Sequence, residues 1–371
     1  MKLLAVVCAM ALLAGCPGGR SRNGGKLADP VSSNEGNIGG SITTELQNDV
    51  LTSYERDEAP DVDTGMIPAD IGGARIGVGP GDVLIASEMA RAPSRWPLRV
   101  DAPTSVASKR LETHLSRDGS AAWVFDEVSW RIATCGRIAV IPLRITMLYA
   151  RDGDRWVPIF EHMSFGHAPT PRLGDLYGVR MPSKSVASSD FVDELSSSMS
   201  PMLSLQPQAA GARVATGPEA ILVGPDVTDE WHGLDLASAK LAAGPMKTVE
   251  DRRIGYVGRS LSQATVAYWI GNVVADLPAR PGVGAGKARM RVTFVFERRR
   301  AVNNNDGATE SERKRREATS CAEDSKDCHW VMVQGHVSQP IGDSELATQV
   351  FGTALLSGNL ESGEPLELAC E

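Results

Sequence analysis

Two similar stretches of sequence decide the fold. Residues 156–164 read WVPIFEHMS and residues 330–338 read WVMVQGHVS, so both fit the pattern W-V-x4-H-x-S. An apolar run precedes each of them, RITMLY at 144–149 and RVTFVF at 291–296. Asp152-Gly153-Asp154 separates the first pair of runs, and such turn residues between β-rich runs predict a hairpin. The sequence therefore predicts the same two closing strands twice.

Further matches upstream predict that one domain occurs twice in the chain. GARI at 73–76 resembles GARV at 211–214, and GPGDVLI at 79–85 resembles GPEAILV at 217–223. Matching blocks that keep their order are the signature of an internal repeat. In each copy a short amphipathic helical pattern comes first, over residues 42–56 and 189–199 respectively. Helices followed by an antiparallel sheet are typical of an α+β fold.

The closing segments resemble those of a known family. RDGDRWVPIFEHMSFG at 151–166 and CHWVMVQGHVSQPI at 328–341 resemble the last strands of SnoaL-like domains, which belong to the NTF2-like superfamily. PDVTDEWHGLD at 225–235 resembles the E-W-x-G segment of that family, whereas the first copy has RAPSRWPL at 91–98 instead. The resemblance implies two cone-shaped domains, each a curved antiparallel sheet packed on N-terminal helices around a pocket. It also implies that the two sheets pair as an intramolecular pseudo-dimer.

The N-terminus resembles a bacterial lipoprotein signal. Lys2 precedes an apolar run over residues 3–13, which is shorter than the roughly 20 residues that span a bilayer. The run ends in LAGC at 13–16, which resembles a lipobox and implies that Cys16 carries diacylglycerol and a further acyl chain such as palmitate. We therefore expect a protein anchored by lipid to a membrane of the cell envelope. Pro17 in place of an aspartate favours the outer membrane, on its periplasmic or surface side.

These observations give an expected domain organisation. In chain order it comprises a signal peptide (1–15), a flexible tether rich in Gly and Ser (16–40), a first SnoaL-like domain (41–172), a second one (176–358) with a hairpin insertion (298–326), and a C-terminal tail (359–371). The alternative reading of the N-terminus is an ordinary signal peptide that contains a cysteine by chance.

Four cysteines remain after the signal peptide and Cys16, namely Cys135, Cys321, Cys328 and Cys370. An even number in an oxidising compartment predicts two disulfides, with three connectivities open. Cys321 with Cys328 closes a short loop and is the first expectation, which leaves Cys135 with Cys370. His329 adjoins this pair, but without a CxxC spacing we expect no metal site.

Composition narrows the classes of partner. The 371 residues carry a formal net charge of −8, which disfavours nucleic-acid binding through the overall field. Apolar residues at 42% and charged residues at 23% are typical of a globular protein. GVGAGK at 282–287 lacks the first glycine and the final Ser or Thr of a phosphate loop, so no cofactor is expected.

The closing strands hold the candidate pocket residues. Alternate residues of a strand share a face, so Trp156 is expected beside His162, and Trp330 beside His336. Trp231, in the E-W-x-G segment, joins them as a candidate. The same side chains would equally serve as core of a sheet face.

One acid/base pair is a candidate for catalysis. Some NTF2-like enzymes hold a carboxylate inside the apolar cone, where it removes a proton next to a carbonyl. The resemblance suggests Asp126 with His162 for that role, in the first copy only, because Asp126 falls near Gly271 in the second copy.

Three functions follow as hypotheses. The leading one is non-catalytic binding of a small apolar ligand or of an envelope protein. The second is an isomerase-, cyclase- or hydrolase-like enzyme that uses Asp126 and His162. The third is a structural component of envelope assembly. Whether the protein is an enzyme stays open, with the balance against.

Overall fold

The structure is a computed structural model of the full chain. It describes residues 37–55, 74–79, 83–85, 95–97, 102–134, 136–166, 184–185, 188–204, 214–215, 217–233, 239, 245–258, 260–279, 284–300, 309, 321, 328–351, 356–357 and 367–368. The expected lipid-bearing Cys16, the signal peptide, Cys135 and Cys370 lie outside these residues.

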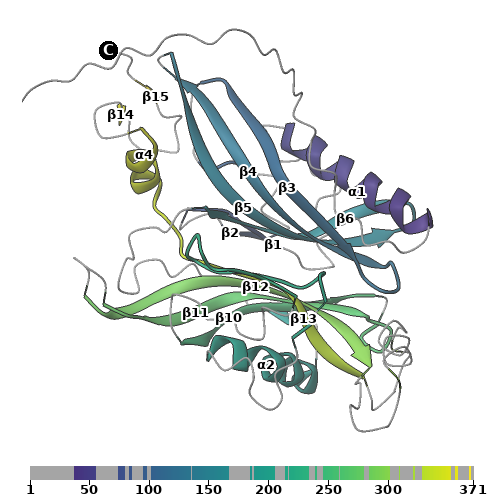
Figure 1. The fold of residues 1–371 in the computed structure, drawn as a ribbon. Coiled ribbons are helices and arrows are strands. Elements are labelled where there is room, and N and C mark those ends of the chain that lie inside the picture. Colours follow the sequence, from purple (N-terminus) through teal and green to yellow (C-terminus); the bar gives the residue numbers. More distant parts are fainter. Residues whose placement is uncertain are drawn as a thin grey trace, which may run out of the picture. The chain divides into compact units, whose positions relative to one another are not determined.

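The described elements are mostly strands, with few helices. In chain order they are α1 (Asn37–Glu55), β1 (Ala74–Ile76), β2 (Val83–Ile85), β3 (Thr104–Leu115), β4 (Ala121–Thr134), β5 (Arg137–Asp152), β6 (Arg155–Phe165), β7 (Lys184–Ser185), α2 (Ser189–Leu203), β8 (Ile221–Val223), β9 (Glu230–His232), β10 (Met246–Val257), β11 (Val266–Leu277), β12 (Gly286–Arg300), β13 (Cys328–Ser338), α4 (Asp343–Phe351), β14 (Leu356–Ser357) and β15 (Glu367–Leu368). The predicted α+β class is confirmed, with the strands in curved sheets (Figure 1).

The two large sheets have the same strand order. The first runs β2-β1-β6-β5-β4-β3, and the second, read from its other end, runs β9-β8-β13-β12-β11-β10 with β7 added at the edge. In both sheets a short strand, β1 or β8, pairs in parallel with the last long strand. The long strands pair antiparallel with one another.

The strand register shows which segments upstream of the closing strands correspond to each other in the two halves. Ile76 of β1 lies opposite His162, and Val223 of β8 lies opposite His336, so β1 corresponds to β8 and β2 to β9. The predicted match of 73–76 with 211–214 is therefore wrong, since Val214 forms only an isolated bridge to Met332. Glycine-containing turn sequences recur in many loops, whereas parallel pairing with the closing strand fixes the true counterpart.

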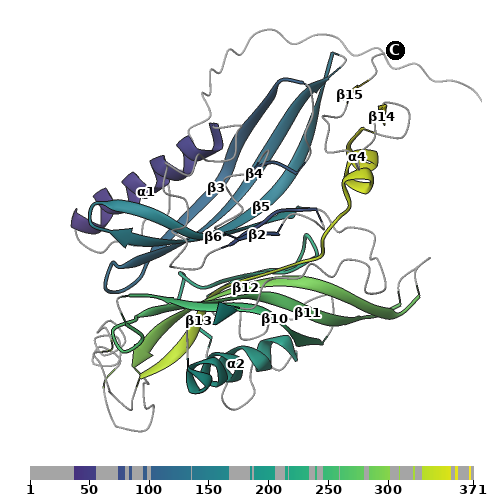
Figure 2. The same cartoon turned by 180° about the vertical axis from the view of Figure 1, so that it is seen from behind.

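One helix covers the outer face of each sheet (Figures 1 and 2). Leu46, Val50 and Tyr54 recur every four residues on α1, so they share one side of the helix and are buried against the first sheet. On α2 the same spacing buries Phe191, Leu195, Met199 and Leu203. The two predicted helices are thus confirmed. The tether was predicted to extend to residue 40, but α1 already begins at Asn37.

The inner faces of the two sheets pack on each other within one compact unit. Trp123 of β4 donates its indole N–H to the carbonyl of Glu219 at 2.8 Å. Gln334 of β13 donates to the carbonyl of Val124 at 2.9 Å. Buried side chains of both sheets form one continuous hydrophobic cluster. A binding site can therefore lie either in the contact between the two sheets or between one sheet and the helix on its outer face.

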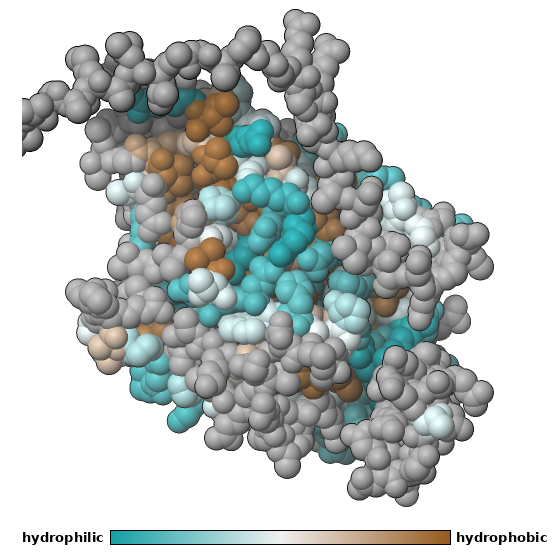
Figure 3. Space-filling view, viewed as in Figure 1, coloured by the Kyte–Doolittle hydropathy of each residue, from teal (hydrophilic) through white to brown (hydrophobic). Residues whose placement is uncertain are grey.

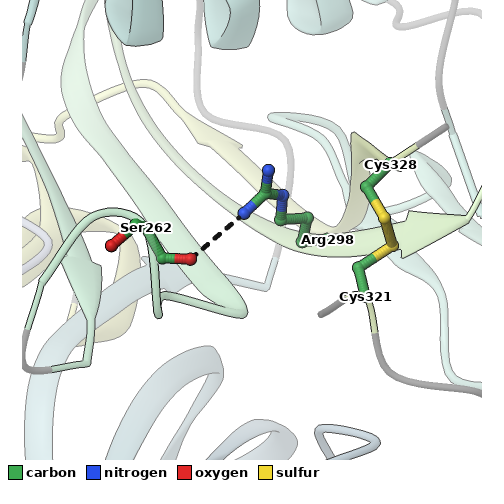
Figure 4. The surroundings of a disulfide bond; sticks show 4 residues. All are labelled: Ser262, Arg298, Cys321 and Cys328. Carbon is green, nitrogen blue, oxygen red and sulfur yellow. Dashed lines mark hydrogen bonds between the residues drawn. A yellow bond between two sulfur atoms is a disulfide. The ribbon is translucent and has the colours of Figure 1, made fainter. Parts of the chain in front are cut away.

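Two features lie toward the end of the chain. Cys321 and Cys328 form a disulfide, as predicted, at the start of β13 (Figure 4). Beside it, Arg298 donates to the carbonyl of Ser262 at 3.3 Å. The helix α4 contributes Leu346 and other buried residues to the cluster of the first sheet, not the second. None of the described helices is long and apolar enough to cross a membrane.

Candidate functional site

A β-bulge decides which closing-strand residues share a face. In the first sheet Leu148 lies opposite Phe160, but the next residue, Tyr149, lies opposite Pro158. Ile159 is therefore the extra residue of a bulge, and the alternation of side chains reverses at this point. In the second sheet the register shifts at the corresponding position, between Val295 and Phe296.

The bulge separates each tryptophan from its histidine. Trp156 belongs to the outer cluster beneath α1, and the ring of Trp330 lies 5.5 Å from that of Phe191 on α2. His162 and His336 instead point into the contact between the sheets. The prediction that tryptophan and histidine share a face is wrong, because it assumed unbroken alternation. Trp231 of β9 is half-buried and packs against the hydrophobic cluster that the two sheets share.

The two histidines meet each other at the centre of the molecule's inner contact. Their rings stack with centroids 3.9 Å apart and an angle of 20° between planes. Four hydrogen bonds to hydroxyls of the opposite sheet hold the rings: His162 Nδ1 to Thr293 Oγ1 at 3.1 Å, His162 Nε2 to Ser338 Oγ at 2.7 Å, His336 Nδ1 to Thr146 Oγ1 at 3.0 Å, and His336 Nε2 to Ser164 Oγ at 2.8 Å. All four ring nitrogens are thereby occupied.

Burial keeps this histidine pair neutral. Desolvation lowers the pKa of His162 well below its usual value, and the positive charges of Arg291 and Arg144 lower it further. Desolvation likewise lowers the pKa of His336, followed by the charges of His162 and Arg144. A neutral, fully hydrogen-bonded imidazole has no nitrogen to offer a substrate. The pair therefore acts as a structural joint between the sheets.

Asp126 lies on the other face of the first sheet from His162. Asp126 is opposite Ile145 in the register, whereas His162 is opposite Thr146, and neighbouring residues of one strand point to opposite faces. The predicted Asp126–His162 pair is therefore not brought together. Asp126 instead faces α1, where it is fully buried.

Only one of the two carboxyl oxygens of Asp126 accepts a hydrogen bond of normal geometry from a described residue. The hydroxyl of Ser108 donates to Asp126 Oδ1 at 2.9 Å. Within the part of the chain that the structure describes, Asp126 Oδ2 and the buried hydroxyl of Tyr54 make no hydrogen bond of normal geometry, although the two groups are close enough for Tyr54 to lower the pKa of Asp126. Desolvation raises the pKa of Asp126 to about 6, against the opposing effects of Ser108, Tyr54 and the backbone of Arg110. A carboxyl of this kind can hold or release a proton near neutral pH.

Aromatic rings extend from Tyr54 in a buried row. Trp96 and Trp130 stack with centroids 6.2 Å apart, and Tyr54 lies 5.9 Å from Trp96. The guanidinium of Arg95 lies over the Tyr54 ring at 4.7 Å. Apolar walls around a few convergent polar groups are typical of small-molecule sites. We call Tyr54, Trp96, Asp126 and Trp130 the Asp126 cluster.

A buried ion pair fixes Arg95 beside the Asp126 cluster. Arg95 donates from Nε to Glu161 Oε1 at 3.2 Å and forms a second, close bond to Oε2. It also donates to the carbonyl and hydroxyl of Ser53 at 3.0 and 2.7 Å. Arg75 of β1 approaches Glu161 from the other side, with Nε 3.6 Å from Oε1. These contacts hold α1, through Ser53 and Tyr54, in a fixed position over the sheet.

The second sheet lacks this constellation at its corresponding positions. By strand register, Arg75, Asp126, Tyr149 and Glu161 correspond to Leu222, Gly271, Phe296 and Gly335. At Gly335 a side chain could not fit without movement, because a Cβ would lie 2.6 Å from Leu222 and 2.9 Å from Phe294. The outer face of the second sheet is thus packed with apolar side chains where the first sheet is polar.

Sequence reasoning identified Asp126 but missed Tyr54, Arg95 and Glu161. Glu161 interrupts an otherwise apolar closing strand, which is a signal that a charge is needed there. Tyr54 and Arg95 come from distant segments and carry no comparable signal. Among the described residues, no group of three or more His, Cys, Asp or Glu side chains could hold a metal ion.

Comparisons with known proteins give little to set beside this geometry. No family model matches the chain, and no curated protein matches it. Among solved structures, the association domain of C. elegans CaMKII is similar to the chain at 13% identity and a TM-score of 0.26, over 34% of this chain and 96% of that one.

Proposed function

We propose that the first half of this protein binds a small, mainly apolar molecule that carries one polar group, without converting it. The observation that carries the proposal is a buried pair of polar groups, the Asp126 carboxyl and the neighbouring Tyr54 hydroxyl, in which Asp126 Oδ2 and the Tyr54 oxygen make no hydrogen bond of normal geometry to any described residue. A buried polar atom without a partner costs free energy, so a fold retains one where a ligand supplies the partner. Below about pH 6 the protonated carboxyl and the phenol can both donate to a ligand oxygen, and above it the carboxylate accepts from a ligand hydroxyl.

The contrast between the two halves supports this assignment. If the polar residues served the fold alone, the second half would need them equally. Instead its counterparts of Asp126 and Glu161 are Gly271 and Gly335, and its outer face is filled by side chains such as Leu222. A binding role confined to one half accounts for this difference.

The fold proposal is that each half is an NTF2-like domain and that the two form a pseudo-dimer within the chain. The shared strand order and the bulge at the same register in both closing strands support it. The reciprocal hydrogen bonds of His162 and His336 support a twofold relation between the sheets. An experimental structure in which residues 104–165 and 246–338 fail to superimpose would contradict it.

The location proposed for the protein is a bacterial cell envelope, where lipid on Cys16 would hold it at the outer membrane. This rests on the sequence of residues 1–17 alone. Intact-mass measurement of protein extracted from its own membrane tests it: loss of residues 1–15 together with the added mass of acyl chains is expected. An unmodified Cys16 would reject the anchor and leave the binding proposal untouched.

The binding proposal can be tested with 2-naphthol, a planar fluorescent molecule with one hydroxyl. We expect saturable binding that weakens about tenfold in Asp126→Leu and in Tyr54→Phe, because each loses a buried hydrogen-bonding group. Tyr256→Phe is the matched control, since Tyr256 packs against Phe191 of α2 in the second half. Equal binding by all four proteins would reject the Asp126 cluster as the site.

The pKa of about 6 favours a second candidate function, proton abstraction from a carbon acid by Asp126. The probe is 2-tetralone, whose α-protons exchange with D2O when a base removes them. Exchange catalysed by the wild type, with a rate that rises through pH 6 and is lost in Asp126→Asn, would favour an isomerase-like enzyme. Binding without exchange would favour the first proposal.

A further inference from the structure

The far end of the β4–β5 hairpin exposes apolar side chains to solvent. Ile138 is 66% exposed and Val140 is 50% exposed, and these are the two most exposed large hydrophobic residues that the structure describes. Gly136, in the left-handed region at φ 71°, forms part of the tight turn that joins the strands. We call residues 131–140 the hairpin end.

The apolar side chains continue the inner face of the first sheet beyond its cover. Val140 lies opposite Arg131 and Ile138 opposite Ala133, whereas Ser129, two residues nearer the centre, is fully buried. Burial of this face therefore ends at Ser129. Figure 3 shows hydrophobic surface at the upper left, where Figure 1 places this end of β4 and β5.

The charge of the hairpin end is opposite to that of the whole chain. Arg131 is exposed on the same face as the apolar pair, opposite Val140, and Arg137 is exposed beside Ile138 on the other face; residues 131–140 contain no acidic residue. The chain as a whole carries a net charge of −8. The corresponding hairpin of the second half is different, because an exposed ion pair between Lys287 and Asp276 at 2.5 Å stands there.

We propose that the hairpin end docks on the surface of a bilayer that contains anionic lipids. Ile138 and Val140 enter the interface between headgroups and acyl chains, and Arg131 and Arg137 bind lipid phosphates. Exposed aliphatic side chains with basic residues nearby are typical of proteins that bind membrane surfaces. The free energy of burying the apolar side chains and that of attraction to anionic lipids both favour binding. The hairpin end has no Tyr or Trp, the residues that dominate protein–protein hot spots.

This contact does not depend on the ligand proposed for the Asp126 cluster, nor on the lipid at Cys16. If both are present, the anchor raises the effective concentration of the hairpin end at the membrane, and the hairpin end fixes the orientation of the anchored protein. The test must therefore remove the acyl chains and leave the rest of the chain intact.

The experiment measures vesicle co-sedimentation of the full chain with Cys16→Ser as background. Vesicles contain either phosphatidylcholine alone or equal parts of phosphatidylcholine and phosphatidylglycerol. We expect preferential binding to the anionic vesicles, reduced about fivefold by each of Arg131→Glu and Val140→Asp. Val227→Asp is the matched control, because Val227 is 49% exposed on a different turn and should leave binding unchanged.

Several results would overturn the proposal. They are absence of binding to anionic vesicles, equal binding of the Val140→Asp and Val227→Asp chains, and equal binding to both lipid compositions. The apolar residues 3–13 are present in every variant and contribute equally to the bound amount, so the difference in binding between variants reports the hairpin end. Self-association abolished by Val140→Asp, without vesicle binding, would identify the surface as a protein contact instead. Circular dichroism of each variant confirms that losses do not arise from unfolding.

Discussion

His162 and His336 stack face to face with ring centroids 3.9 Å apart, one from each closing strand. Each ring is bonded to the threonine that lies beside the other histidine in its sheet, Thr293 for His162 and Thr146 for His336. Two neutral imidazoles satisfy this arrangement, whereas two imidazolium ions at that distance would repel each other. The joint between the halves is therefore sensitive to acid.

Acid should weaken the folded state through these histidines. The pKa of each is lowered in the folded protein, so below about pH 6.5 the unfolded chain binds protons that the folded chain does not. The free energy of unfolding should fall with decreasing pH from that point, by up to about a hundredfold in the folding equilibrium per pH unit for two protons. Urea unfolding between pH 8 and pH 5 measures this slope.

The double variant His162→Gln, His336→Gln tests whether these two histidines cause the acid sensitivity. Glutamine keeps a donor and an acceptor but does not titrate, so the slope below pH 6.5 should shrink. An unchanged slope in the double variant would show that other groups cause the sensitivity.

Asp126→Asn should stabilise the protein at high pH. Because burial raises the pKa of the carboxyl to about 6, folding pays a cost above that pH to hold it ionised, and the cost disappears as pH falls toward 3.8. We expect a gain of about 1–3 kcal/mol at pH 8 and a smaller gain at pH 5. Urea unfolding at both values measures it. A loss of stability at both would mean that the carboxylate supports the fold.

Glu161→Gln should destabilise the protein by about 3–5 kcal/mol, because it leaves the buried guanidinium of Arg95 without its counter-charge. Asp152→Asn is the control, since Asp152 pairs with Arg155 at an exposed turn and should cost less than about 1 kcal/mol. Chemical unfolding at pH 7 compares them. Equal effects of the two substitutions would contradict the claim that the buried Arg95–Glu161 pair stabilises the fold more than an exposed pair does.

Gly335→Ala should destabilise the second half by about 1–3 kcal/mol, because its Cβ would meet Leu222 at 2.6 Å in a filled core. Gly284→Ala provides the comparison, because nothing lies within 4 Å of the added atom. Thermal unfolding of both variants is the measurement. If Gly335→Ala were neutral, the outer face of the second sheet would have space that could admit a ligand.

Much of the fold could be predicted from local patterns. The two W-V-x4-H-x-S segments do form corresponding strands, β6 and β13, because hydrophobic alternation and turn residues specify strands locally. The sequence gives a sign of the bulge in one copy only. Pro158 indicates an irregular strand in the first copy, whereas its counterpart in the second copy, Met332, gives no such indication. One extra residue in each closing strand places Trp156 and Trp330 on the sheet face opposite to the predicted one.

The site was predictable only in part. Asp126 is noticeable because it interrupts an apolar strand, but its partners come from elements far apart in the chain. Tyr54 belongs to α1 and Arg95 precedes β3 by several residues, and no spacing links them to Asp126. Their proximity results from the packing of α1 on the sheet, which depends on contacts made across the whole first half.

The helix α4 completes the core of the first half, although it follows the whole second sheet in the chain. Leu346 and Phe351 are buried with Leu46 and Trp130, and the N–H of Ile341 donates to the carbonyl of Val78 at 3.0 Å. A nascent chain that has reached only residue 340 therefore holds a first sheet with one wall missing. Ribosome stalling or a premature stop codon between β13 and α4 would leave that wall open. Such products should be substrates for chaperones and proteases, even though they contain every residue of the Asp126 cluster.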